Sequence, residues 1–263
     1  MKQTYTVLLQ GLLLLIAVLL LFVLLMGTDW AGLTNAEERS EQTAQRVGEL
    51  MYDFINETEE VATDTALTNP VHQLIQKLCR DNGIDYSSVT FHVLLNDEVN
   101  AFALPGRQLV VYTGLLDECR NESELAGVLA HELAHIEQDH VMKKLAKELG
   151  FSMLSTLTND GETLGLVFET LGSSAYDREL EIAADMAAVE YLEVAGLNPR
   201  AFADILYRID GMQDSSPEFL DWISTHPDAQ SRAEAVMDAV DSELPIPEPV
   251  LPSAMWDDMK AAL

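Results

Sequence analysis

The sequence predicts an α+β domain that is predominantly helical, contains a small antiparallel sheet and follows one N-terminal transmembrane helix. Three observations support this prediction. Residues 7–26 are almost purely apolar, residues 89–112 alternate apolar and polar side chains in short runs, and most of the remaining chain repeats apolar residues at helical spacing. The residues after the span are numerous enough for one domain with a sizeable core.

The apolar segment from Val7 to Met26 is interrupted only by Gln10 and Gly11, and as a helix it would be about 30 Å long. No small-x-small cleavage site follows it, which favours an uncleaved anchor over a signal peptide. Lys2 precedes the span and acidic residues follow it. The positive-inside rule therefore places residues 1–6 in the cytosol and the domain outside, as a single-pass protein of the inner membrane.

Three segments follow the span. Residues 27–69 carry an amphipathic helix and an acidic linker, and residues 70–243 form the folded domain. Residues 244–263 are a proline-rich connector and a short tail. The chain therefore contains one folded domain, without internal repeats.

The charge balance restricts the partners. The net charge is −29, from 44 acidic and 15 basic residues, and this field repels both nucleic acid and anionic lipid surfaces. The acidic residues are spread along the chain, so solubility alone could account for them. We expect no nucleic-acid partner.

Two cysteines, Cys79 and Cys119, are present. An extracytoplasmic domain would permit a disulfide between them, although sequence does not show whether their Cα atoms come within bonding range. No CxxC spacing supports a metal site.

Several elements follow from periodicity and breakers. Strands are expected at 89–95, 100–104 and 108–112, and helices at 69–82, 124–150, 177–195, 198–211 and 228–240. His92 lies on the polar side of its strand and is expected to be exposed.

A metal-binding motif lies within the helix predicted from Glu124 to Gly150. His131 and His135 are four residues apart, so their imidazoles share one helix face and can reach one ion, with Glu132 beside them. In this HExxH arrangement the histidines bind zinc and the glutamate acts as general base toward water. The alternative is two solvated histidines on an ordinary helix, which the interleaved apolar residues argue against.

A catalytic zinc site needs a third protein ligand. His140 lies nine residues after His131, about 180° away on one continuous helix, and Val141 stands where another protease class has histidine. A distant helix must supply the ligand, and Glu181 and Asp185 lie one turn apart on a suitable one. One carboxylate would bind the metal while the other supports a histidine. An ordinary salt-bridged helix face is the alternative.

Several short motifs occur in a fixed order between about residues 70 and 240. They are Asn100-Ala101-Phe102, Pro105-Gly106, Thr113-Gly-Leu-Leu116, His131-Glu-Leu-Ala-His135, Arg178-x-x-Glu181-x-x-Ala184-Asp185 and Thr225-His226-Pro227. In this combination the chain resembles metallopeptidase family M48. The resemblance implies a gluzincin-like zinc metallopeptidase domain with one Zn²⁺ per chain.

The resemblance also implies roles for individual residues. Glu181 becomes the third metal ligand, and Asp185 supports the active site. The strand that begins at Asn100-Ala101-Phe102 would line the cleft and pair with extended substrate. His226 would lie near the metal, as a cover of the open position, a ligand of a resting form or an oxyanion donor. Arg232 resembles the arginine that commonly follows this histidine.

Two departures from the family pattern leave the implied ligand set untouched. Asp177 precedes Arg178 where relatives often have serine, and the residue before His140 is Asp139, where relatives often have arginine.

The predicted function is a membrane-anchored, zinc-dependent endopeptidase with Glu132, Asp185 and His226 in the catalytic group. By family analogy its polypeptide substrates are unfolded or misassembled envelope proteins, which would place it in cell-envelope protein quality control. One alternative is a chaperone-like or binding module with a latent metal site. Another is a zinc hydrolase that acts on a non-peptide amide.

Overall fold

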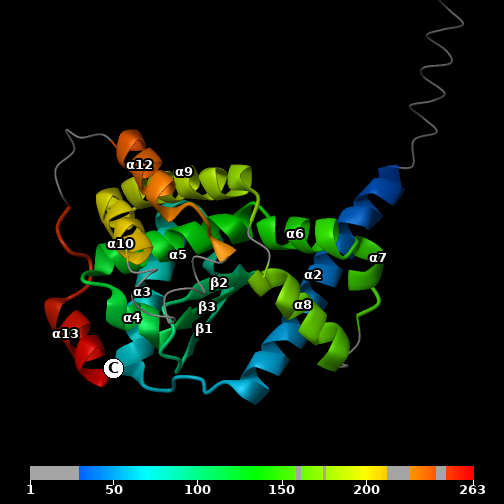
Figure 1. The fold of residues 1–263 in the computed structure, drawn as a ribbon, viewed down its shortest axis with the longest axis horizontal. Helices are drawn as coiled ribbons and strands as arrows, with labels where there is room; N and C mark the ends of the chain where they lie inside the picture. Colours follow the sequence, from blue (N-terminus) through cyan, green and yellow to red (C-terminus); the bar gives the residue numbers. More distant parts are fainter. Residues whose placement is uncertain (1–29, 158–160, 174–175, 212–224, 241–246) are drawn as a thin grey trace, which may run out of the picture. The chain divides into compact units, whose positions relative to one another are not determined.

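The computed structural model describes residues 30–157, 161–173, 176–211, 225–240 and 247–263 (Figure 1). Residues 43–263 form one compact unit. In the described ranges, no helix combines the length and the apolar character needed to cross a bilayer. The predicted span at residues 7–26 lies outside these ranges.

The described part of the domain contains one sheet, with the strand order β1-β3-β2. Its strands are β1 (Thr90–Leu94), β2 (Ala101–Leu104) and β3 (Gln108–Tyr112). β2 is antiparallel to β3, as predicted, but β1 pairs with β3 in parallel, so the prediction of an antiparallel sheet is wrong. The hairpin places β3 between β1 and β2, which leaves β2 at an edge. Alternation of side chains does not specify this order.

Helices cover both faces of β1. Phe91 packs against His72 of α3 (Thr65–Asp81), with ring centroids 5.8 Å apart. His92 stacks on Tyr52 of α2 (Trp30–Thr58) at 3.8 Å. Because adjacent strand residues point to opposite faces, α2 and α3 lie on opposite sides of the strand. His92 is half-buried, so its expected exposure is wrong.

The remaining described elements follow in chain order. They are η1 (Tyr86–Ser88), α4 (Thr113–Glu118), α5 (Glu122–Glu137), α6 (His140–Glu148), α7 (Phe151–Leu154), α8 (Gly161–Ser173), α9 (Arg178–Val194), α10 (Pro199–Gly211), α12 (Ala229–Ala239) and α13 (Ser253–Ala262). α5 runs through the centre of the domain, where it packs against α9, α10, α3 and strands β2 and β3 (Figure 1).

The helix that was predicted to open at Asn69-Pro70 begins earlier. Asp64 caps α3, because its carboxylate accepts a hydrogen bond from the Ala66 N–H at 2.8 Å. Pro70 therefore lies inside the helix. The cap lies within a polar stretch that had suggested a linker.

The single helix predicted from Glu124 to Gly150 is instead two helices. α5 ends at Glu137, Asp139 adopts a left-handed backbone conformation with φ of 54°, and α6 begins at His140. A left-handed residue interrupts the helical hydrogen-bond ladder. The angular argument that placed His140 on the opposite face from His131 therefore does not apply.

Cys79 and Cys119 are both buried and free, so they form no disulfide in this structure. Burial raises the pKa of the Cys79 thiol to about 11. The thiol is therefore protonated at neutral pH.

The contact between α5 and α10 depends on Gly127. A Cβ at this position would lie 2.6 Å from Phe202 Cβ. We expect Gly127→Ala to lower the free energy of unfolding by about 1–3 kcal/mol, because the added methyl group would overpack the contact between the two helices. Urea denaturation of the detergent-solubilised chain measures it. Gly165→Ala on α8 is the control, since no atom lies within 4 Å of its added Cβ. Equal effects of both substitutions would show that the contact imposes no constraint.

Candidate active site

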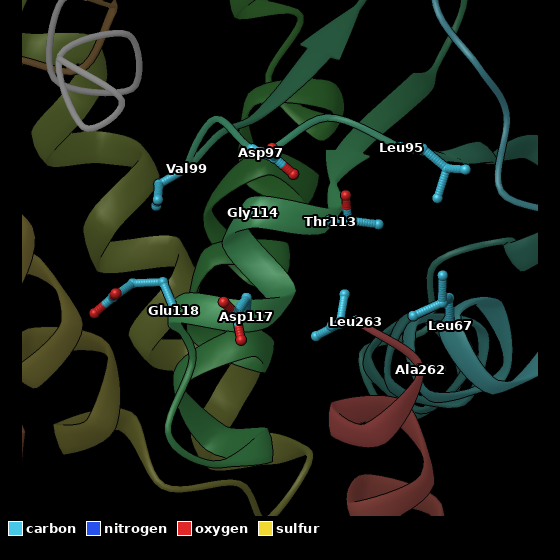
Figure 2. Close-up of a pocket in the computed structure, with 10 residues that line it drawn as sticks. All are labelled: Leu67, Leu95, Asp97, Val99, Thr113, Gly114, Asp117, Glu118, Ala262 and Leu263. Carbon is cyan, nitrogen blue, oxygen red and sulfur yellow. The ribbon is translucent and has the colours of Figure 1, made fainter. Parts of the chain in front are cut away.

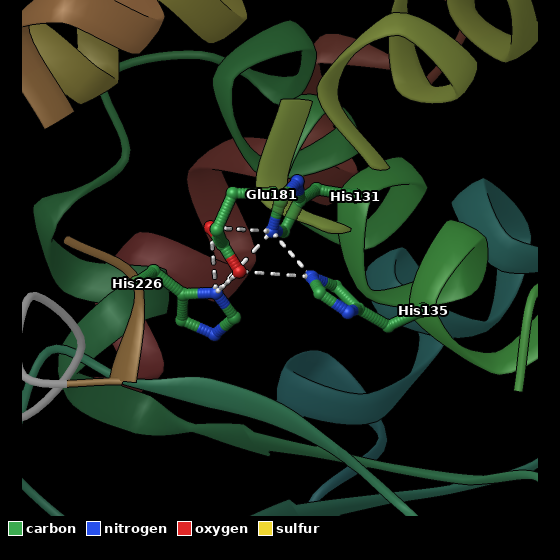
Figure 3. A group of neighbouring side chains, drawn as sticks. All are labelled: His131, His135, Glu181 and His226. Carbon is green, nitrogen blue, oxygen red and sulfur yellow. Dashed lines mark hydrogen bonds and ion pairs between the residues drawn. The ribbon is translucent and has the colours of Figure 1, made fainter. Parts of the chain in front are cut away.

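Four side chains from distant parts of the sequence meet in one buried cluster (Figure 3). His131 and His135 come from α5, Glu181 comes from α9, and His226 precedes α12. One ligand atom of each lies within 4.8 Å of the others. Every one of these side chains is at most 1% exposed. The structure thus brings together the predicted ligands and His226.

The separations fit a single zinc ion. Nε2 of His131 lies 3.0 Å from Nε2 of His135 and 3.3 Å from Nδ1 of His226. Oε1 of Glu181 lies 3.4 Å from Nε2 of His135 and 3.1 Å from Nδ1 of His226. Zinc ligands at about 2.0–2.1 Å in a tetrahedron are about 3.3 Å apart. The donor types, imidazole and carboxylate, are also those zinc takes.

Arg232 organises the carboxylates behind the cluster. Its guanidinium donates two hydrogen bonds to Asp185, at 2.8 and 2.7 Å, and Nη1 lies 2.6 Å from Oε2 of Glu181. Asp185 in turn lies 3.0 Å from Nδ1 of His131. The predicted supporting position of Asp185 is therefore present geometrically. Arg232 links it to the third candidate ligand.

These contacts set the protonation states. Burial alone would raise the pKa of Asp185, but its hydrogen bonds from Arg232 lower it to about 2. Burial opposes ionisation of Glu181 too, yet His226 and Arg232 hold its pKa well below the ordinary value. Burial lowers the pKa of His131 to about 3, so that imidazole is neutral. The carboxylates of Asp185 and Glu181 are therefore ionised at neutral pH, beside a neutral His131.

Glu132 lies beside the cluster with one oxygen fixed and one unbonded. Oε2 accepts a hydrogen bond from the Ala103 N–H at 3.0 Å. Oε1 is buried without a hydrogen bond among the described residues; its contact with Nε2 of His226, at 3.5 Å, is too long for one. Burial is the main cause that raises the pKa of Glu132 to about 7. This carboxyl group can exchange a proton near neutral pH.

Buried charge is unbalanced around the cluster. Glu132, Glu181 and Asp185 are three carboxyl groups, whereas among the described arginines and lysines only Arg232 forms an ion pair with any of them. Buried charges are normally paired or bound to metal. A divalent cation would compensate for the excess, so the charge and the donor set point to the same ligand.

The edge of β2 that pairs with no strand in the described part of the chain, called the free edge below, faces Glu132. The Tyr112 N–H bonds to the Asn100 carbonyl, so every second residue of β2 pairs with β3. The main-chain groups of Ala101 and Ala103 consequently point away from β3, which agrees with the bond from Ala103 to Glu132. The Asn100 Oδ1 is buried and, in the described part of the chain, without a hydrogen bond. Phe102 uses its main chain in the pairing with β3.

Two residues that no sequence motif identified pack around the histidines. The ring of Tyr176 lies 4.3 Å from that of His135 and 5.5 Å from that of His226. Lys144, on α6, places its Nζ 4.3 Å from the centre of the Tyr176 ring. Burial lowers the pKa of Lys144 to about 8. Because both residues reach the site only through tertiary packing, no signal in one sequence could have identified them.

A hollow lies apart from the cluster. It has a volume of about 470 Å³ and is lined by α4, the loop before β2 and the end of α13 (Figure 2). Its side chains include Asp97, Asp117 and Glu118, and none of the cluster residues lines it. Val99, which also lines it, places it near the start of β2.

Comparison with known proteins identifies the group to which this arrangement belongs. A model of peptidase family M48 matches residues 65–240. The chain belongs to peptidase family M48. The family resemblance drawn from the motifs is thereby confirmed, and with it the metallopeptidase class. The match begins at the first residue of α3 and ends just after α12.

Individual members of family M48 are similar to this chain in sequence. The mitochondrial metalloendopeptidase OMA1 of Bos taurus is 30% identical over 205 residues, which cover 70% of this chain and 39% of the relative. The beta-barrel assembly-enhancing protease of Escherichia coli K12 is 29% identical over 188 residues, 64% of this chain and 38% of the relative. The metalloprotease LoiP of the same strain is 24% identical, over 62% of this chain and 67% of the relative. The chain thus spans less than two fifths of the length of the first two.

Loss of Arg232 should destabilise this M48 domain. In metal-free protein we expect Arg232→Met to lower the free energy of unfolding at pH 7 by about 3–5 kcal/mol, because two buried carboxylates lose their cation. The folded pKa of Asp185, about 2, lies below its unfolded value of about 3.9. Its pairing therefore stabilises the fold above about pH 4 and is lost as the pH falls toward 2.

The measurement is urea denaturation at pH 7 and at pH 3. Arg178→Met is the matched control, because Arg178 is mostly exposed and lies 3.9 Å from Asp228. We expect it to change the free energy by less than about 0.5 kcal/mol. A loss in Arg232→Met that did not shrink at pH 3 would exclude the proposed pairing as its cause.

Proposed function

We propose that the chain is a membrane-anchored, zinc-dependent endopeptidase. The observation that carries this proposal is the position of Glu132. It lies between a set of side chains at zinc-ligand separations and the free edge of a strand. Such an edge can align an extended peptide beside the metal-binding residues.

Three residues would hold the metal ion: His131, His135 and Glu181. Zinc bound there would act as a Lewis acid toward the scissile carbonyl and lower the pKa of water. Asp185 would accept a hydrogen bond from Nδ1–H of His131 and so fix the direction of Nε2. Arg232 would keep Asp185 and Glu181 ionised.

Glu132 would be the general base and then the general acid. Its unbonded Oε1 is available to accept a proton from the attacking water, while the Ala103 N–H holds Oε2 in place. A carboxyl group with a pKa of about 7 can accept this proton and later donate it to the leaving amine.

Substrate would bind as an added strand along β2. The main-chain N–H and carbonyl of Ala101 and the carbonyl of Ala103 point toward the free edge and would bond to the peptide backbone, while the Ala103 N–H remains on Glu132. The Asn100 Oδ1 would accept a further hydrogen bond at the start of this edge. Phe102 would contribute through its side chain. Backbone pairing of this kind favours unfolded polypeptides, because folded segments do not expose a free strand.

His226 would control access to the metal. Its Nδ1 already lies among the ligand atoms, where it would fill the position that substrate needs. A displaced His226 would open that position and could donate a hydrogen bond to the oxyanion. The cluster is buried, so substrate entry requires some such movement.

The cellular setting follows from the N-terminal residues and the relatives. The apolar stretch at residues 7–26 would cross the inner membrane as a single transmembrane helix. The catalytic domain would then lie outside the cytosol. One relative is named for β-barrel assembly and another for mitochondria. Unfolded or misassembled envelope proteins are therefore the proposed substrates.

Substitution of Glu132 tests the proposed chemistry. We expect full-length Glu132→Gln in detergent to lose casein cleavage by at least about 10³-fold while it keeps one zinc per chain. Glu181→Ala should lose both zinc and activity. Glu137→Gln, on the same helix but paired with Arg107 at the surface, is the matched control and should keep both.

The other outcomes identify the rival functions. Glu132→Gln protein that still supports the cellular role would indicate a chaperone-like or binding module. Cleavage of small amides but not of peptides would indicate a non-peptide amidase. Full zinc content in Glu181→Ala would exclude this residue as the third ligand.

The pH dependence of catalysis should report the protonation of Glu132. A general base is active when deprotonated, so kcat/KM should fall as the pH falls through the pKa of the base. That value is about 7 in the metal-free site, and a bound cation would lower it. We therefore expect an acidic limb at or below pH 7 for a fluorogenic peptide. A rate that rises as the pH is lowered from 7 to 5 would contradict the assignment.

A further inference from the structure

The two motif histidines have polar partners on the side away from the cluster. Nδ1 of His131 lies 3.0 Å from a carboxylate oxygen of Asp185. Nδ1 of His135 lies 3.1 Å from Nδ1 of His140, and the two rings are 4.9 Å apart at 76°. One partner is a carboxylate and the other is an imidazole. His140 is 2% exposed, so water does not readily replace it.

We propose that His140 is a positioning residue that accepts a hydrogen bond from Nδ1 of His135 and thereby holds Nε2 of His135 toward the metal. This inference rests on the proposed zinc site. A neutral imidazole that binds metal through Nε2 carries its hydrogen on Nδ1. His140 must then accept with its own Nδ1 and carry its hydrogen on Nε2.

The break between α5 and α6 makes this contact possible. On one continuous helix, a residue five positions after His135 would lie about 140° around the axis. The left-handed conformation of Asp139, with φ of 54°, redirects the chain so that α6 starts with His140 against His135. The interruption therefore supplies the geometry that helical periodicity would forbid.

A second residue of α6 supports the other side of His135. Lys144 lies one turn after His140, and its Nζ donates a hydrogen bond to the Leu171 carbonyl at 3.0 Å. The same Nζ lies over the ring of Tyr176, which packs on the ring of His135 at 4.3 Å. These contacts fix α6 relative to His135, so the position of His140 is fixed as well.

The charge balance explains why the partner of His135 is an imidazole. In the zinc-loaded site the divalent ion and Arg232 would together offset Glu132, Glu181 and Asp185. Another carboxylate beside His135 would leave a net negative charge in this buried place, whereas a neutral imidazole accepts the hydrogen bond without charge. His140 thus orients His135 without adding a charge. Asp185 orients His131 and also places a negative charge beside it.

Substitutions that remove or keep the acceptor test the proposal in the full-length chain. His140→Phe fills the same space without an acceptor, and His140→Asn keeps an oxygen at the position of Nδ1. We expect His140→Phe to raise the zinc dissociation constant by about 10–100-fold in chelator competition. His140→Asn should remain within about threefold of the wild type. His92→Phe is the matched control, since it removes the bond from His92 to Gln108 at a distance from the metal ligands.

The visible spectrum of Co²⁺-substituted protein provides a readout of ligand geometry. Its bands should change in His140→Phe and be restored in His140→Asn. Wild-type zinc affinity and an unchanged spectrum in His140→Phe would overturn the proposal and leave the proposed function intact. Equal losses in His140→Phe and His140→Asn would also overturn it. Wild-type protein that binds no zinc would overturn the proposed function, and this inference with it.

A measurement on the unsubstituted protein does not depend on the folding of a variant. Long-range ¹H–¹⁵N spectra of the zinc-loaded chain report which nitrogen of each histidine carries hydrogen. We expect hydrogen on Nδ1 of His135 and on Nε2 of His140. Hydrogen on Nδ1 of His140 would overturn the proposal, because that nitrogen could not then accept the bond.

Discussion

The bidentate contact of Arg232 with Asp185 is the interaction on which the site depends most. It holds ionised carboxylates in a buried place, where they would otherwise take up protons. Asp185 then orients His131, and the remaining nitrogen of Arg232 reaches Glu181. One guanidinium does not balance all the carboxyl groups present. The excess charge that remains is the property that suits the site to a divalent cation.

The same helix links this charge to the sheet. Glu132 lies next to His131 in sequence, and its carboxylate accepts a hydrogen bond from the edge strand at Ala103. The proposed base, the candidate ligands and the edge that would carry a peptide are therefore fixed to one another through α5. Burial raises the pKa of Glu132 and also closes the site. If Glu132 acts as the proposed base, some movement of the surrounding chain would have to admit the substrate.

The sequence predicted the parts of this site that depend on local spacing. The HExxH pair, the strands at 101–104 and 108–112 and the helix with Glu181 follow from period and composition, and family motifs added His226. The partner of β1 and the turn at Asp139 were missed. Strand alternation does not name a neighbour, and an aspartate in a left-handed conformation carries no breaker signal. Tyr176 reaches the histidines, and Lys144 reaches Tyr176, only through tertiary packing.

The most direct measurement of the metal-binding assignment is zinc K-edge X-ray absorption of the full-length protein beside Glu181→Ala. We expect nitrogen and oxygen donors at about 2.0–2.1 Å, scattering from at least two imidazoles, and loss of one oxygen donor or of the metal in the variant. A sulfur donor at about 2.3 Å would contradict the assignment. An identical donor set in both proteins would contradict the role of Glu181.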